Sequence, residues 1–114
     1  MAGMKVAEVN LENGYPVVEE ALRELVSRLM TCKGRGIKGV ILIHGYGSSG
    51  AGGKIGPAVR RKVREDSLSG IVRASCGGEQ WMDKKREIIQ LCPALAQCER
   101  RIAGNPGVTV VVLK

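Results

Sequence analysis

The sequence is poor in aromatic residues and contains a single histidine. Of its 114 residues none is Phe, one is Trp and two are Tyr, so a core must be built from Val, Ile, Leu and Ala. Such a core favours helices layered on a sheet over an aromatic-rich β-sandwich. The four cysteines form no C-x-x-C pair, and the sequence has one histidine, so few ligands are available for a zinc site. We expect them to stay reduced and to pack as small apolar residues.

Long apolar runs are also missing. No stretch approaches the ~20 apolar residues that span a bilayer, and the first residues lack the apolar segment of a secretion signal. We therefore expect a soluble, cytoplasmic protein without a membrane partner. The length is that of one domain, and no linker divides residues 1–114. Nothing in the sequence indicates an oligomeric state.

The positive charge is concentrated in the middle of the chain. Eighteen Lys and Arg against eleven Asp and Glu give a net charge of +7. Residues 31–73 contain nine basic and two acidic side chains, whereas residues 1–30 contain three and five. Clustered cations favour a polyanionic partner such as DNA or RNA, because binding releases the counterions condensed on phosphate backbones. A surface that only keeps the protein in solution is the alternative explanation.

The apolar pattern predicts alternating strands and helices. Strands are expected at residues 5–11, 40–43, 71–74 and 108–113, and helices at about 16–33 and 56–65. A helical insert at about 79–104 contains Pro93, where we expect a kink or a division into shorter helices. Trp81 is expected to anchor this insert to the core. The order βαβαβ, insert, β predicts a small open sheet with helices packed on it.

A glycine-rich turn follows the second predicted strand. Residues 44–54 are His-Gly-Tyr-Gly-Ser-Ser-Gly-Ala-Gly-Gly-Lys, and the next predicted helix is basic. In that helix Ile55, Val59 and Val63 are expected to face inward, and Arg60, Arg61 and Arg64 outward. Glycines let the backbone approach a phosphate, and a helix N-terminus adds positive potential. A dinucleotide fingerprint does not fit, because it would follow the first strand and need an acidic ribose partner after the next one. The predicted phosphate-binding residues are Gly45, Tyr46, Gly47, Ser48, Ser49, Gly50, Lys54, Arg60, Arg61 and Arg64.

Residues 41–47, Ile-Leu-Ile-His-Gly-Tyr-Gly, resemble the H-G-x-G motif of the Smr (small MutS-related) domain family. The helix start at residues 17–22, Val-Val-Glu-Glu-Ala-Leu, and the last strand at 107–113 are also similar to the family pattern. The family's L-D-L-H motif has no counterpart here, because the matching tetrapeptide, 9–12 or 11–14, contains no histidine. The resemblance implies a two-layer α/β sandwich with a mixed four-stranded sheet, similar to the C-terminal domain of translation initiation factor three.

The same resemblance implies nucleic-acid binding and, in some members, nicking of DNA or RNA. In a nicking enzyme His44 would transfer a proton as general acid or base, and a structural residue that caps the turn is the alternative. Glu12, at the end of the first strand, is the second candidate catalytic residue. Glu8 and Glu12 are candidate ligands for Mg²⁺ or Mn²⁺, with solvated surface carboxylates as the alternative interpretation.

Three functions therefore remain open from the sequence. The first is a metal-assisted nicking endonuclease that uses the H-G-Y-G turn and the basic helix. The second is a nucleic-acid-binding module without catalysis, and the third is a sensor of a small phosphate or nucleotide. A steep salt dependence of binding to long nucleic acid would favour the first two, because it counts neutralised phosphates.

Overall fold

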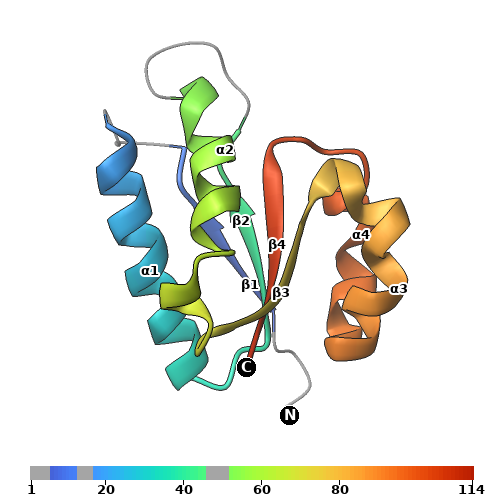
Figure 1. Cartoon of the computed structure of the whole chain (residues 1–114). Coiled ribbons are helices and arrows are strands. Elements are labelled where there is room, and N and C mark those ends of the chain that lie inside the picture. Colours follow the sequence, from blue (N-terminus) through green and yellow to red (C-terminus); the bar gives the residue numbers. More distant parts are fainter. Residues whose placement is uncertain (1–5, 13–16, 46–51) are drawn as a thin grey trace.

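The protein is a mixed four-stranded sheet with helices on both faces (Figure 1). The computed structural model describes residues 6–12, 17–45 and 52–114, with side chains from residue 55 onward in the last range. The strands are β1 (Val6–Asn10), β2 (Gly39–Ile43), β3 (Val72–Gly77) and β4 (Val108–Leu113). The α-helices are α1 (Val18–Gly34), α2 (Gly52–Lys62), α3 (Trp81–Leu91) and α4 (Glu99–Ile102). Short 3₁₀ helices are η1 (Asp66–Leu68), η2 (Gly78–Gln80) and η3 (Pro93–Cys98).

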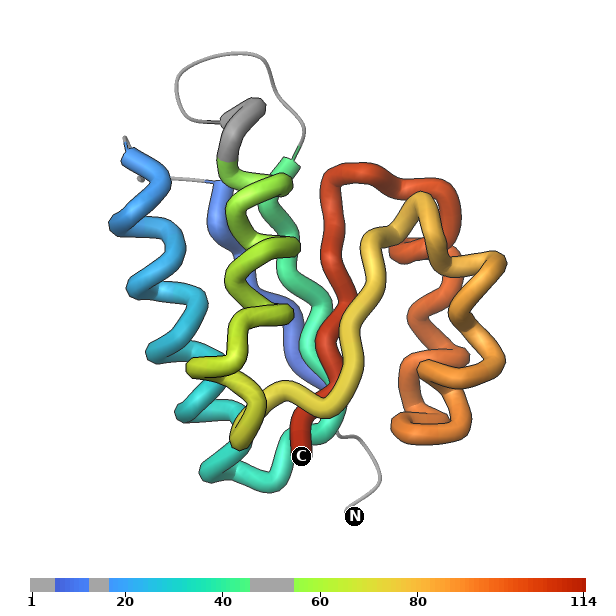
Figure 2. Tube along the Cα trace, in the orientation of Figure 1, coloured from blue at the N-terminus to red at the C-terminus, as the bar shows by residue number. Residues whose placement is uncertain are grey.

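The strand order places three strand ends together. The order is β1-β2-β4-β3, in which β1 is parallel to β2, and β4 is antiparallel to both of its neighbours. Figure 2 shows β4, in red, between β2 and β3. Because β1, β2 and β3 run in one direction, their carboxyl ends meet at one end of the sheet, beside the start of β4. The register confirms this, since Ile43 lies opposite Val108, and Gly77 opposite Thr109.

Side chains that alternate along the strands build a separate apolar core on each face. On one face Val40, Leu42 and Val111 pack with buried residues of α1 and α2. On the other face Ile41, Val110 and Val112 pack with the segment from η2 to α4. The mixed sheet with α1 and α2 against it confirms the expected α/β fold, and the helical insert adds a layer on the opposite face. Trp81 is fully buried in this second core, as expected for an anchor of the insert.

Two elements differ in extent from the sequence prediction. The third strand continues to Gly77, because its pairing with β4 includes Ser75, Cys76 and Gly77, which carry little apolar signal. Helix α2 begins at Gly52, ahead of the expected start, and contains Pro57 in its interior. The expected break at Pro93 is confirmed, since α3 ends at Leu91 and a 3₁₀ helix follows.

Two further expectations concern the cysteines and the membrane. All four cysteines are free thiols, and three of them are buried, as expected for apolar packing residues. None of the described helices is long and apolar enough to cross a membrane.

Candidate functional site

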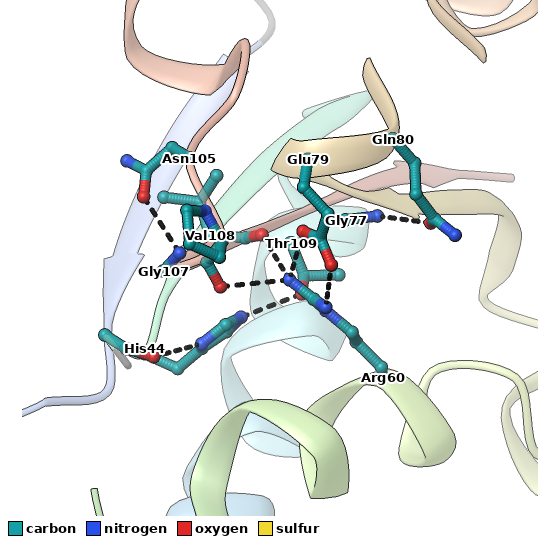
Figure 3. A network of polar contacts seen from close by, with 11 residues as sticks. His44, Arg60, Gly77, Glu79, Gln80, Asn105, Gly107, Val108 and Thr109 are labelled. Carbon is teal, nitrogen blue, oxygen red and sulfur yellow. Dashed lines mark hydrogen bonds and ion pairs between the residues drawn. The ribbon is translucent and has the colours of Figure 1, made fainter. Parts of the chain in front are cut away.

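Polar side chains from five elements meet at the carboxyl end of the three co-directional strands. Glu12 follows β1, His44 follows β2, Glu79 follows β3, and Thr109 lies near the start of β4. Arg60 reaches this group from α2 (Figure 3). The sheet topology thus gathers residues that are distant in the sequence. We call His44, Thr109, Arg60 and Glu79, which are linked by hydrogen bonds, the His44 network.

Backbone hydrogen bonds hold His44 in place independently of the contacts of its ring. The backbone N–H groups of His44 and Gly45 both donate to the carbonyl of Gly107, each at 2.9 Å. The Gly107 N–H in turn donates to Asn105 Oδ1 at 2.8 Å, which fixes the Asn-Pro-Gly turn that precedes β4. Helix α2 also approaches the ring closely, since a Cβ at Gly56 would lie 3.0 Å from His44 Nδ1. Glycine at this position therefore allows the helix to pack against the imidazole.

Both ring nitrogens of His44 have hydrogen-bond partners. Nδ1 lies 2.9 Å from the carbonyl of Gly45, and since a carbonyl only accepts, Nδ1 carries the hydrogen. Nε2 lies 2.8 Å from the Thr109 hydroxyl. Burial lowers the pKa of His44, which is 2% exposed, against the opposing effect of the Gly45 hydrogen bond. The ring is therefore neutral at pH 7, and Nε2 accepts the hydrogen of Thr109.

Arg60 closes the network. Its Nε donates to Thr109 Oγ1 at 3.2 Å, which is free to accept because its own hydrogen points to His44. Its two terminal nitrogens pair with the Glu79 carboxylate at 2.5 and 2.8 Å, and Nη2 also donates to the carbonyls of Pro106 and Val108. Burial alone would raise the pKa of Glu79, but hydrogen bonds and the charge of Arg60 outweigh it and lower that pKa.

The prediction that Arg60 faces outward with its neighbours is therefore wrong. Its side chain is one-quarter exposed, and its charge is compensated by Glu79. Arg61 and Arg64 are exposed, as expected, whereas Val59 and Val63 face the core. The helical period of 3.6 residues predicts which side chains are exposed and which are buried. For a side chain at the boundary between the two faces, the environment depends on the residues of other elements that lie beside it.

Glu12 lies beside the first glycine of the H-G-Y-G turn. Its backbone N–H donates to Asn10 Oδ1 at 2.7 Å, and the preceding residue, Leu11, extends the pairing of β1 with β2. Gly45 has a φ of +70°, and a Cβ there would lie 2.6 Å from Glu12 Oε2. Glycine is thus required at position 45 by both its backbone conformation and the carboxylate against it. The placement brings together two of the predicted site residues, Glu12 and His44.

Glu8, in the middle of β1, and the carboxylates at this end of the sheet do not by themselves fit a Mg²⁺ or Mn²⁺ site. Such ions take several oxygen ligands. Glu8 pairs with Arg101 of α4, and Glu79 pairs with Arg60, which leaves Glu12 as the carboxylate here without an ion pair to a described residue. Within residues 6–12, 17–45 and 55–114, no three His, Cys, Asp or Glu side chains are grouped in a way that would hold a metal ion.

The other predicted site residues are placed in part. Tyr46, Gly47, Ser48, Ser49 and Gly50 lie outside the described residues, and so does the side chain of Lys54. Sequence reasoning missed Thr109 and Glu79 as members of the site. Thr109 is the one polar residue in an otherwise apolar final strand, and a lone hydroxyl in a buried strand is a signal that a partner is needed. Glu79 gives no comparable signal in the sequence.

The comparisons with known proteins agree with this architecture. The sequence profile of the Smr domain matches residues 15–114. The crystal structure of the Smr domain of Thermus thermophilus MutS2 is similar to this chain with a TM-score of 0.60 and 26% sequence identity. That similarity covers 95% of this chain and 98% of the other. A comparison with curated protein sequences gives no match.

The profile match takes in nearly the whole chain, including α2, β3 and the insert. Smr domains are in general nucleic-acid-binding domains, and some of them nick their substrate. The family that the sequence motifs suggested is thus confirmed by the profile and by the three-dimensional structure. The chain belongs to the Smr domain family.

Proposed function

We propose that this chain binds DNA or RNA through the phosphate backbone, at the end of the sheet where β1, β2 and β3 terminate. The observation that carries the proposal is the set of exposed bases on and just after α2, the helix whose Gly56 packs against the ring of His44. Arg61 on α2 and Arg64, two residues after it, are exposed, and among the described residues neither is within ion-pair distance of a carboxylate. The middle of the chain, which contains this helix, accounts for the whole net charge of +7.

The His44 network supports a binding role by shaping the turn. A neutral, buried ring that donates to Gly45 and accepts from Thr109 fixes the direction in which the chain leaves β2. The glycine-rich residues that follow then start from a defined position. In this proposal His44 positions the phosphate-binding turn without contacting the phosphate.

The test is binding of labelled duplex DNA and structured RNA over a range of salt concentrations. We expect log K to fall linearly with log salt, with a slope that reflects several phosphates at about 0.9 for each on duplex DNA. Binding of a mononucleotide that saturates without a salt slope would replace the proposal by a small-phosphate sensor. A failure to retard any polynucleotide at low salt would contradict it.

Nicking is the second candidate function, and the neutral state of His44 favours it. An imidazole that is unprotonated at pH 7 is able to accept a proton, although Thr109 would first have to turn its hydroxyl away. The experiment is nicking of supercoiled plasmid and cleavage of a labelled structured RNA with Mg²⁺ or Mn²⁺. Cleavage that disappears with chelator and in both His44→Gln and Glu12→Gln would establish catalysis. Equal cleavage by wild type and variants would indicate a contaminating nuclease.

A further inference from the structure

A polar hollow of about 340 Å³ lies between α2, the outer edge of β3 and the start of α3. Among the described strands, β3 pairs with β4 alone, so its other edge is available at this point. We call this hollow the edge pocket. Its lining includes Arg64 from the turn after α2, Ser75 and Gly77 from β3, Gln80 from η2 and Lys84 from α3. Arg60 and Thr109 of the His44 network form its inner wall.

The edge pocket contains more positive charge than its neighbours compensate. Arg60 is paired with Glu79, but Arg64 and Lys84 form no ion pair with any described residue. Arg64 Nε donates to the backbone carbonyl of Arg60 at 3.1 Å, which holds its guanidinium at the rim. Two uncompensated cations, one in the turn after α2 and one on α3, therefore line the same hollow.

Neutral donors complete the pocket. The Gly77 N–H donates to Gln80 Oε1 at 3.1 Å, which ties the oxygen of this amide to the backbone and leaves its NH₂ group as a donor (Figure 3). Ser75 contributes a hydroxyl. The Cys76 thiol also lines the hollow, and burial raises its pKa to about 11, so it adds no negative charge at neutral pH. A phosphate, with several acceptor oxygens, matches these donors better than a carboxylate does.

The adjoining hollow shows the opposite balance and limits the site to one phosphate. It extends from Arg64 along β3 to Arg73, and Glu65, Asp66 and Glu87 also line it. Three carboxylates against two cations make that hollow unsuitable for a polyanion. The anion-binding region therefore ends at Arg64 and does not continue along the edge of β3.

We propose that the edge pocket is a phosphate subsite that takes one backbone phosphate of the bound nucleic acid, separate from the glycine-rich turn after β2. This inference rests on the proposed function. Gly77 lies opposite Thr109, and Thr109 contacts His44, so the subsite is two strands away from the turn at the same end of the sheet. A bound strand that contacts both places crosses the start of β4.

The first experiment uses inorganic phosphate as the probe and amide NMR shifts of the full chain as the readout. We expect the shifts to concentrate at Ser75, Gly77, Gln80 and Lys84, and to disappear in Lys84→Ala. The matched control is Arg86→Ala, which removes an equal charge from another face of α3. Shifts that stay away from the pocket, or that respond equally to both variants, would overturn the subsite.

The second experiment measures oligonucleotide binding with the same variants. Lys84→Ala and Arg64→Gln should each weaken binding about 3- to 10-fold and reduce the salt slope by about one phosphate, while Arg64→Lys and Arg86→Ala retain both. If the oligonucleotide binds wild type, Lys84→Ala and Arg64→Gln alike, the subsite is wrong and the proposed function stands. If phosphate shifts the pocket but no oligonucleotide binds, the subsite stands as an anion site and the proposed function is wrong.

Discussion

The His44 network and the edge pocket have Arg60 and Thr109 in common, yet they differ in how far the charge of their arginines is compensated. In the network each nitrogen of the Arg60 guanidinium has at least one partner, which is a hydroxyl, a carboxylate or a carbonyl. In the pocket the Arg64 side chain, four residues later, has one hydrogen bond to the described residues, and its acceptor is a backbone carbonyl. A cation whose charge is compensated stabilises the fold, and a cation without a carboxylate partner is available to a ligand.

Because of this difference, we expect the two regions to affect two different properties, the free energy of unfolding and the affinity for nucleic acid. Substitutions in the His44 network should reduce the free energy of unfolding, because they leave buried groups without partners. Substitutions of the exposed bases should leave stability nearly unchanged and reduce affinity for nucleic acid. Variants that affect both properties equally would show that the two regions are not distinct.

The largest effect is expected for Arg60→Ala. The substitution removes the ion pair of Glu79, which has no other ion-pair partner among the described residues. It also removes the N–H group that donates to the buried Thr109 hydroxyl. Because the Glu79 side chain is 43% exposed, water screens part of the lost ion pair, and we expect a loss of about 2 kcal/mol in the free energy of unfolding, measured by urea denaturation. Arg61→Ala, on the exposed side of the same helix, is the control and should change stability by less than about 0.5 kcal/mol. Equal losses in the two variants would contradict the assignment of Arg60 to the network.

Thr109→Val should have the next largest effect. Valine keeps the shape of the side chain but leaves His44 Nε2 without its donor and Arg60 Nε without its acceptor. Because Thr109 is 1% exposed, water does not replace the hydroxyl, and the expected loss is about 1–2 kcal/mol. Thr109→Ser, which retains the hydroxyl, should recover most of this loss. If serine and valine are equally destabilising, the hydroxyl has no role and packing of the methyl group explains the effect.

As the pH is lowered, the free energy of unfolding should decrease first because of His44 and only at lower pH because of the carboxylates. The folded pKa of His44 is lowered, so below about pH 6.5 the unfolded chain takes up a proton that the folded chain does not. The stabilisation is complete above about pH 6.5 and is lost as the pH falls to the folded pKa, by up to about 1.4 kcal/mol for each pH unit. Glu79 titrates below its ordinary 4.5, which separates the two effects. In His44→Gln, stability between pH 6.5 and pH 5 should be flat, and an unchanged slope would assign the effect elsewhere.

The order of strands and helices could be predicted from the sequence, because apolar periodicity reports on burial. Leu25 and Leu29 on α1, Val59 on α2 and Val63 just after it lie in the core, as their spacing indicates. The family and the position of His44 also followed from local signals. The environment of His44 did not, because it depends on Thr109, which is 65 residues away and comes near only through the pairing of β2 with β4.

The two arginines at positions 60 and 61 show the same limit more directly. They are adjacent and identical in the sequence, and the sequence predicts one role for both. What separates them is Glu79, which α2 meets only because β3 continues to Gly77 and places η2 beside the helix. A contact between residues of two different elements depends on how those elements pack together, so the local sequence does not predict it.

The smallest effect on stability, and the clearest on binding, is expected for Arg61→Ala. Arg61 is exposed and lies outside both the His44 network and the edge pocket, so the free energy of unfolding should change by less than about 0.5 kcal/mol. If the exposed face of α2 contacts the phosphate backbone, the salt slope for duplex DNA should decrease by about 0.9, which is one phosphate. Arg100→Ala removes the same charge from α4 on the opposite face of the sheet and should leave the slope unchanged. Equal slopes for the two variants would show that net charge, and not the position of α2, determines binding.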